Sequence, residues 1–249
     1  MEKYCALILA GGEGKRMMSD KPKALSEVLN KPMLEWILDA LRESGIHNLC
    51  VVTGSKKEYI DEYLSNLPYV VETAYQAERL GTGHAVMMAK SFLESAGEDV
   101  IILGGDAPFI DSKTIKEAYD LHKSADASAC VISAEVTDPH GYGRIVRDDS
   151  GELLAIVEQK DADEECAKIK EVNSGAYWFN TKALLSVLDE IKSDNAAHEY
   201  YLPDALKILL SKGKRVTAYK AESSDIVLGA NDPQQLAELN EIAKEKYSK

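Results

Sequence analysis

The chain has 249 residues, of which 45% are hydrophobic and 29% charged, and its formal net charge at pH 7 is −13. This composition predicts a folded chain with a sizeable core, and the acidic balance argues against nucleic acid as a general partner. No apolar run reaches the ~18–20 residues of a membrane span, and the N-terminal apolar run is too short for a signal peptide. The four cysteines have no metal-binding spacing, which predicts reduced thiols in the cytoplasm.

Apolar strand patterns alternate with amphipathic helix patterns through the first half of the chain. Strands are predicted at residues 5–10, 49–53, 69–75, 100–103 and 127–136, and helices at 33–44, 56–67, 83–94 and 114–124. Such alternation is typical of an α/β protein whose mostly parallel sheet carries helices on both faces.

The first predicted strand runs into three glycines, Gly11, Gly12 and Gly14, and then into the cations Lys15, Arg16 and Lys23. The sequence matches neither the dinucleotide fingerprint, which needs a third spaced glycine, nor the P-loop. Glycines let backbone amides close around phosphate oxygens, and the cations supply positive charge. The segment therefore predicts a triphosphate site, and the alternative is an ordinary glycine turn leaving a strand.

A polar, glycine-rich segment follows at residues 75–85. The amide of Gln76 offers both a donor and an acceptor, which suits the edge of uracil, and Gly81 and Gly83 would let a base approach the backbone. The alternative is a plain helix start with Thr82 as its N-cap. His84 lies beside apolar residues, so we expect a packing histidine rather than a general base.

An aspartate, Asp106, stands just beyond the buried strand predicted at residues 100–103. This position faces the same ligand crevice as the glycine loop, and Mg²⁺ commonly takes one or two carboxylates together with substrate phosphates. Asp106 is therefore a candidate magnesium ligand, with a turn cap as the alternative. No second aspartate accompanies it, so Asn231 is the candidate second ligand, although a turn residue before a helix would also explain it.

The second half of the chain changes pattern. Antiparallel strands are predicted at residues 143–146 and 153–158, further strands at 172–180 and 216–220, and helices at 181–191 and 202–212. These additions make the predicted sheet mixed. A last helix is predicted from Pro233, capped by Asp232, to residue 249.

Eight segments in order together resemble the sugar-1-phosphate nucleotidyltransferases, nearest to their N-acetylglucosamine-1-phosphate uridylyltransferase domains. They lie at residues 9–17, 22–23, 76–85, 105–108, 141–145, 156–162, 173–175 and 199–204. The resemblance covers nearly the whole chain and implies a Rossmann-like nucleotide-diphospho-sugar transferase fold. It also implies magnesium-dependent transfer of UMP from UTP to N-acetylglucosamine 1-phosphate.

The resemblance also implies roles for individual residues. With the glycine loop, the expected nucleotide-binding residues are Ala10, Gly11, Gly12, Gly14, Gln76, Gly81 and Thr82. Arg16 would hold the departing pyrophosphate and Lys23 would bridge phosphates at the reacting centre. Asp106 and Asn231 would bind Mg²⁺, and the amino sugar would be held by Gly143, Glu158 and Asn173.

The expected organisation is a nucleotidyltransferase domain over residues 1–228, divided near residue 136 into nucleotide and sugar parts, and a C-terminal helix over 229–249. The acetyltransferase domain that accompanies the bifunctional members of the family is not expected here. The expected partners are UTP and a sugar 1-phosphate, with a homo-oligomer left open.

Departures from the family pattern keep alternatives open. Lys15 replaces a small hydroxyl residue, Ala197-His198 stands where Gln-Gly is usual, and Pro203 replaces a threonine. Glucose or N-acetylgalactosamine 1-phosphate is therefore an alternative acceptor. A non-catalytic nucleotide-sugar sensor is disfavoured, because the chain keeps the charged residues that turnover requires.

Overall fold

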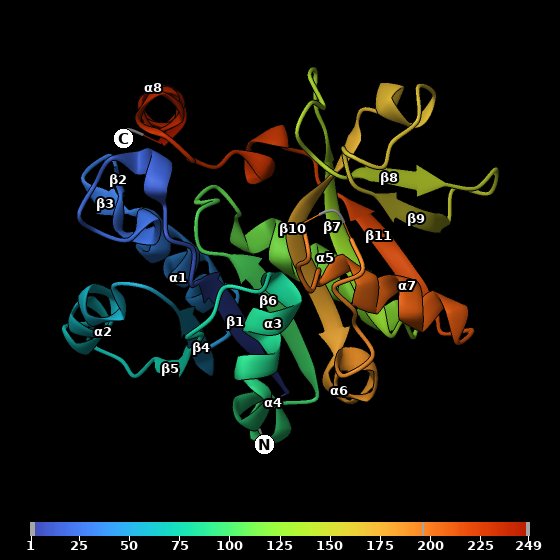
Figure 1. The fold of residues 1–249 in the computed structure, drawn as a ribbon, viewed down its shortest axis with the longest axis horizontal. Coiled ribbons are helices and arrows are strands. Elements are labelled where there is room, and N and C mark those ends of the chain that lie inside the picture. Colours follow the sequence, from blue (N-terminus) through green and yellow to red (C-terminus); the bar gives the residue numbers. More distant parts are fainter. Residues whose placement is uncertain (1–2, 196, 248–249) are drawn as a thin grey trace.

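The computed structural model of the protein describes residues 3–195 and 197–247 (Figure 1). Its strands are β1 (Tyr4–Ala10), β2 (Glu27–Val28), β3 (Lys31–Pro32), β4 (Leu49–Thr53), β5 (Glu72–Tyr75), β6 (Asp99–Gly104), β7 (Ala129–Glu135), β8 (Arg144–Arg147), β9 (Leu153–Val157), β10 (Glu171–Asn180) and β11 (Val216–Lys220). Its α-helices are α1 (Met33–Glu43), α2 (Lys57–Ser65), α3 (Thr82–Met88), α4 (Lys90–Ala96), α5 (Ser112–Ser124), α6 (Thr181–Leu188), α7 (Pro203–Ser211) and α8 (Pro233–Tyr247).

One mixed sheet organises the chain. Its strand order is β11-β7-β10-β6-β1-β4-β5, and β8 and β9 extend it beside β10. Strand β1 pairs in parallel with β4 and β6, whereas β10 runs antiparallel between β6 and β7. The predicted α/β class with a mixed, mostly parallel sheet is confirmed.

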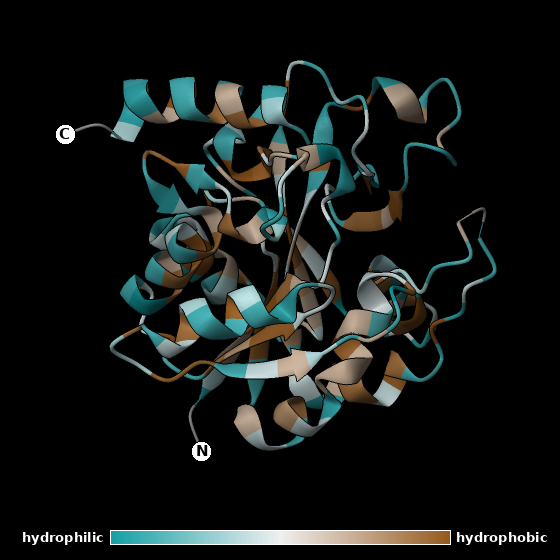
Figure 2. Cartoon of the chain, turned by 60° about the vertical axis from the view of Figure 1, so that its left-hand side comes forward, coloured by the Kyte–Doolittle hydropathy of each residue, from teal (hydrophilic) through white to brown (hydrophobic). Residues whose placement is uncertain are grey.

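Helices cover both faces of this sheet, because alternate strand residues point to opposite sides. In β1, Ala6 and Ile8 join a core with the apolar faces of α1, α2 and α5. Cys5 and Leu7 join a second core with α3, α4, α6 and α7. Figure 2 shows hydrophobic residues in the central strands and an alternation of hydrophobic and hydrophilic residues along the surrounding helices. The described residues contain no helix long and apolar enough to cross a membrane.

A third, smaller apolar cluster joins the last helix to an early hairpin. Met33 and Phe109 pack there with Leu239 and Ala243 of α8. The side chain of Asn240 accepts the backbone N–H of Leu29, at 2.9 Å, in the turn between β2 and β3. Figure 1 accordingly shows α8, in red, beside the blue β2–β3 hairpin. The C-terminal helix thus returns to the N-terminal part of the fold.

The structure corrects two predicted elements. The helix expected at residues 83–94 is two helices, α3 and α4, because the chain leaves helical geometry at Ala89 (φ −95°, ψ 13°). The β2–β3 hairpin was not predicted; it turns at Leu29 and Asn30, whose φ angles are both positive. The cap of the last helix is confirmed, since Asp232 accepts the N–H of Gln235 at 2.9 Å. The predicted end of that helix, residues 248–249, lies outside the described residues.

All four cysteines lie among the described residues. Cys5, Cys50 and Cys130 are buried in strands and Cys166 is half-buried. No disulfide joins cysteines in the described part of the chain.

A buried carboxylate fastens β6 to α5. Asp99 is fully buried and accepts hydrogen bonds from Tyr119 (3.1 Å) and Lys123 (3.0 Å), and its other oxygen lies 3.2 Å from Nε2 of His122. Burial opposes ionisation of Asp99, but the hydrogen bonds from His122 and Lys123 outweigh it. They hold the pKa of Asp99 below its ordinary value.

We predict that Asp99→Asn lowers the free energy of unfolding at pH 7 by about 2–3 kcal/mol, because its buried donors lose a charged acceptor. Since the folded pKa is the lower one, the stabilisation is present above the unfolded value of about 3.9 and is lost as pH falls through the folded value. Urea unfolding at pH 7 and pH 3 should show a smaller difference between wild type and variant in acid.

The matched control is Asp189→Asn, which removes an exposed ion pair with Lys90. We expect its effect to stay below about 0.5 kcal/mol at both pH values. An equal loss of unfolding free energy in the two variants would show that the buried hydrogen bonds of Asp99 do not stabilise the fold more than an exposed ion pair does.

Candidate functional site

A cavity of about 490 Å³ lies at the carboxyl ends of β1 and β6. Its walls come from the loop after β1, the end of β6, the start of α3 and the middle of β10, and Lys23 and Glu199 also line it. Ligands of open α/β sheets bind at such an edge, and the volume suits a small molecule. The cavity is therefore the candidate site.

The glycine loop reaches this cavity through close backbone packing. A Cβ on Gly11 would lie 2.7 Å from Oε1 of Gln76, and a Cβ on Gly54 would collide with the carbonyl of Gly11. Gly14 has φ +61°, and a Cβ there would lie 3.0 Å from Cβ of Lys23. A Cβ on Gly12 would meet no atom within 4 Å, so packing does not require glycine at this position. A ligand can therefore approach the backbone of Gly12.

The cations after the loop separate in the structure. Lys23 lines the cavity, whereas Arg16 is exposed in the short 3-10 helix Lys15–Met17 and is not part of the cavity wall. Lys15, whose role the sequence left open, pairs with Glu13 at 3.1 Å. Glu13 also pairs with Arg79, a cavity residue that the sequence analysis did not select.

Three predicted residues converge on one point. The ammonium of Lys23 donates to Oδ2 of Asp106 and, at 2.9 Å, to Oδ1 of Asn231. Asp106 follows β6, and Asn231 precedes α8 and donates its backbone N–H to Gln235 at 2.8 Å. The Lys23 side chain is largely buried, with 17% of it exposed. Two oxygens from distant segments thus face a single cation.

This oxygen pair fits a magnesium ligand set, because Mg²⁺ favours carboxylate and amide oxygens and takes its other ligands from water and phosphates. No group of three or more His, Cys, Asp or Glu side chains suited to a metal occurs among the described residues. A divalent ion bound here would consequently depend on substrate oxygens to complete its coordination.

The segment around Gln76 is tightly packed. Its amide nitrogen donates to the carbonyl of Gly81 at 3.1 Å and lies 3.1 Å from Nδ1 of His84. Gly81 is the N-cap of α3, so Thr82 is not the cap that the alternative interpretation required. The Thr82 hydroxyl instead accepts the N–H of Leu202, at 3.0 Å.

The predicted sugar-side residues are neighbours at the edge of this site. The N–H of Asn173 donates to the carbonyl of Gly143 at 2.9 Å, and a Cβ on Gly143 would lie 3.1 Å from Oε1 of Glu158. Burial raises the pKa of Glu158 above its ordinary value, although Lys207 opposes this. The Asn173 amide donates at 2.7 Å to the hydroxyl of Tyr177, which lines the cavity.

Comparison with known proteins identifies the family. The model of the nucleotidyl transferases matches residues 5–227. The chain belongs to the nucleotidyl transferase family. This agrees with the resemblance that the sequence motifs indicate.

Two curated relatives and one solved structure show how similar the chain is to known proteins. The nucleotidyl transferase is 43% identical over 249 residues to bifunctional protein GlmU of Acetivibrio thermocellus, and 44% identical over 244 residues to the protein of that name from Clostridium beijerinckii. These alignments cover 100% and 98% of the chain but 53% of each relative, so the chain spans about half the length of the curated relatives it matches. A solved structure of UDP-glucose pyrophosphorylase complexed with UDP-glucose shares the fold, with a TM-score of 0.80 and 21% identity over 99% of this chain and 100% of that chain.

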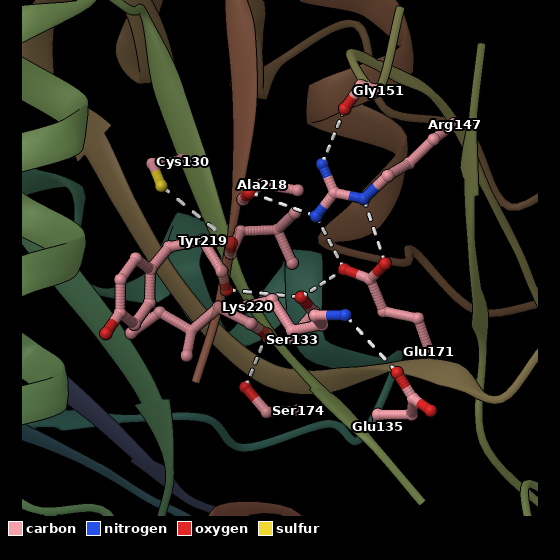
Figure 3. A network of polar contacts seen from close by, with 12 residues as sticks. Cys130, Ser133, Glu135, Arg147, Gly151, Glu171, Ser174, Ala218, Tyr219 and Lys220 are labelled. Atoms are coloured by element: carbon pink, nitrogen blue, oxygen red, sulfur yellow. Dashed lines mark hydrogen bonds and ion pairs between the residues drawn. The ribbon is translucent and has the colours of Figure 1, made fainter. Parts of the chain in front are cut away.

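A network of charged and polar side chains joins strands β7, β8 and β10 of this nucleotidyl transferase (Figure 3). Arg147 of β8 donates to both oxygens of Glu171 in β10, at 2.9 and 2.6 Å, and Ser133 of β7 donates to the same carboxylate at 2.6 Å. Burial disfavours the charge on Glu171, but these hydrogen bonds outweigh it and lower its pKa. Just beyond Glu171, the β7–β10 register shifts between Asn173 and Ala176, which places this bulge in the cavity wall.

Several cavity residues of the nucleotidyl transferase were not selected from the sequence. Arg79, Tyr177 and Glu199 line the cavity, and Gly54 packs behind Gly11. The sequence does contain a signal for Gly54, because this glycine directly follows the strongly apolar strand β4, which pairs with β1. The other three lie in segments where nothing in the sequence pattern distinguishes the inward-facing residue.

The backbone at Gly81 gives a stability test. Gly81 has φ +104° and ψ 177°, a region open essentially to glycine alone, and a Cβ would lie 2.5 Å from the carbonyl oxygen of Tyr200. We predict that Gly81→Ala costs about 3 kcal/mol or more in the free energy of unfolding, measured with urea.

Gly213→Ala is its control, because Gly213 also has positive φ (+69°) but open space around it. The control isolates backbone strain and should cost about 1 kcal/mol. Equal costs would mean that the contact with Tyr200 does not constrain the loop.

Proposed function

We propose that the chain transfers the uridylyl group of UTP to N-acetylglucosamine 1-phosphate, with Mg²⁺ as cofactor and pyrophosphate as second product. The observation that carries this proposal is that Lys23, which lines the cavity with Asp106, Gln76 and Gly81, contacts both Asp106 and Asn231. The family assignment and the relatives named bifunctional protein GlmU support it. The division of the chain near residues 136 and 228, and a cytoplasmic location, belong to the same proposal.

The reaction needs positioning and charge neutralisation more than covalent chemistry. A phosphate oxygen of the sugar 1-phosphate attacks the α-phosphorus of UTP, and the bond between that phosphorus and the bridging oxygen breaks as pyrophosphate leaves. The attacking phosphate is already ionised at neutral pH, so it requires no general base. The work of the site is to bring two anions together in line.

Asp106 and Asn231 would hold Mg²⁺, which supplies positive charge to the phosphate oxygens when it is bound. Lys23 would then turn from these two oxygens to the phosphates around the reacting phosphorus. Its ammonium is well placed for this, because it already lies in the cavity wall. The side chain thus neutralises charge at the point where charge builds up in the transition state.

The remaining proposed roles divide between the two substrates. The nucleotide would lie against the cavity-lining residues Ala10, Gly11, Gly12, Gln76, Gly81 and Thr82. Gly14, which does not line the cavity, would complete the phosphate loop. Arg16 would reach the departing pyrophosphate from its exposed 3-10 helix. Glu158 would accept hydrogen bonds from sugar hydroxyls, beside Gly143 and Asn173.

A pyrophosphate-release assay tests the proposal directly. It should use UTP, CTP, ATP and dTTP as donors, and the 1-phosphates of N-acetylglucosamine, N-acetylgalactosamine and glucose as acceptors. The proposal expects the highest kcat/KM with UTP and N-acetylglucosamine 1-phosphate. Preference for another acceptor would change the substrate assignment, and no turnover with UTP and any of these acceptors would refute the proposed activity.

The convergence at Lys23 makes a second prediction. Lys23→Met should lower kcat by at least about a hundredfold, because it removes charge at the transition state. It should also tighten Mn²⁺ binding in the absence of nucleotide, because the ammonium no longer occupies the Asp106 and Asn231 oxygens. Steady-state kinetics and electron paramagnetic resonance titration measure the two effects.

Lys90→Met, which removes an ion pair on the protein surface, serves as the control and should leave both quantities within about threefold. Weaker Mn²⁺ binding in Lys23→Met would show that Lys23 does not compete with the metal for these oxygens.

A further inference from the structure

The orientation of the Gln76 amide is fixed by two neighbours. The side chain is almost fully buried, and its Nε2 contacts both the carbonyl oxygen of Gly81 and Nδ1 of His84, each at 3.1 Å. A carbonyl oxygen can only accept a hydrogen bond, so the group facing Gly81 must be the NH₂ group. The contact with Gly81 therefore assigns the two ends of the amide.

This assignment also determines the protonation of His84. Because Gln76 presents an N–H to Nδ1, that ring nitrogen must be the acceptor. His84 is then the neutral imidazole with its proton on Nε2. The ring is half-buried on α3, with its centroid 6.3 Å from that of Tyr200. The neighbouring N–H of Gly83 donates to the Tyr200 carbonyl at 2.7 Å, which ties this turn of α3 to the same segment.

The other end of the amide is left for a ligand. Oε1 of Gln76 lies beside Gly11, where a Cβ would come within 2.7 Å of it, and both residues line the cavity. In the described part of the chain, no hydrogen bond goes to this oxygen. Gln76 therefore presents its oxygen to the cavity, and the amide cannot rotate to present its NH₂ group without losing both contacts.

We propose that His84 is a positioning residue that makes the site select uracil over cytosine. This inference rests on the proposed uridylyl transfer. With both N–H groups of Gln76 occupied by Gly81 and His84, Oε1 can accept the N3–H of uracil. Cytosine has no proton at N3, so two acceptors would face each other. Rotating the amide to suit cytosine would bring its oxygen against the Gly81 carbonyl and the His84 lone pair.

Two substitutions separate this role from simple packing. In His84→Asn, an amide oxygen can take the place of Nδ1 as acceptor, whereas His84→Leu has nearly the shape of asparagine without an acceptor. The measurement is kcat/KM for UTP and for CTP, with N-acetylglucosamine 1-phosphate as acceptor. We expect His84→Asn to keep the wild-type ratio of UTP to CTP within about threefold. His84→Leu should lower this ratio about tenfold, because a buried donor of Gln76 loses its partner.

The KM for the sugar 1-phosphate should stay within about twofold in both variants, since the effect concerns the base alone. A wild-type ratio in a folded His84→Leu variant would overturn the inference and leave the proposed function intact. A wild-type protein that does not prefer UTP to CTP would overturn both.

A spectroscopic readout requires no substitution. Nitrogen-15 NMR of the intact protein should show His84 protonated at Nε2 and unprotonated at Nδ1 near pH 7.5. A proton on Nδ1 would contradict the proposal whatever the kinetics of the variants.

Discussion

The shared hydrogen bonding of Lys23 with Asp106 and Asn231 is the interaction on which the candidate site depends. The partners lie 83 and 208 positions from Lys23 in the sequence, so one ammonium ties together three distant parts of the chain. The net charge of −13 gives the whole protein an electrostatic field that repels polyanions. A cation inside the site is therefore needed to attract them locally. The proposed substrates are polyanions. Their capture must therefore rely on short-range charge and on backbone amides rather than on long-range attraction.

The sheet explains why these groups can meet. Strands β1, β4 and β6 are parallel, so the segments that follow them emerge at one edge. Close packing there requires glycine at positions such as Gly11 and Gly54, where a Cβ would collide. The antiparallel β10 then runs beside β6, and its bulge brings Ser174 and Gly175 into the wall of the same cavity. Residues from parallel and from antiparallel strands thus line one cavity.

The sequence was sufficient to predict the position of a residue where that position follows from the strand pattern. Asp106 stands out because a fully apolar run ends just before it, and its position at the sheet edge follows from topology alone. The direction of an exposed side chain has no such signal, which is why Arg16 was expected at the phosphates but lies outside the cavity wall. The break at Ala89 was missed because alanine is a good helix former, and only tertiary packing splits α3 from α4. His84 was interpreted as a packing residue, and its contact with Gln76 became visible only in three dimensions.

The return of α8 to the β2–β3 hairpin has a consequence for how the molecule is made. A ribosome releases β1 and its glycine loop long before the oxygen of Asn231 and the helix that anchors it, because Asn231 lies 208 positions after Lys23. The central sheet also stays open until β10 enters between β6 and β7. These pairings of high sequence separation form late, because closing long loops is entropically unfavourable. A nascent chain can therefore build much of its core before the segment that carries Asn231 reaches the pocket.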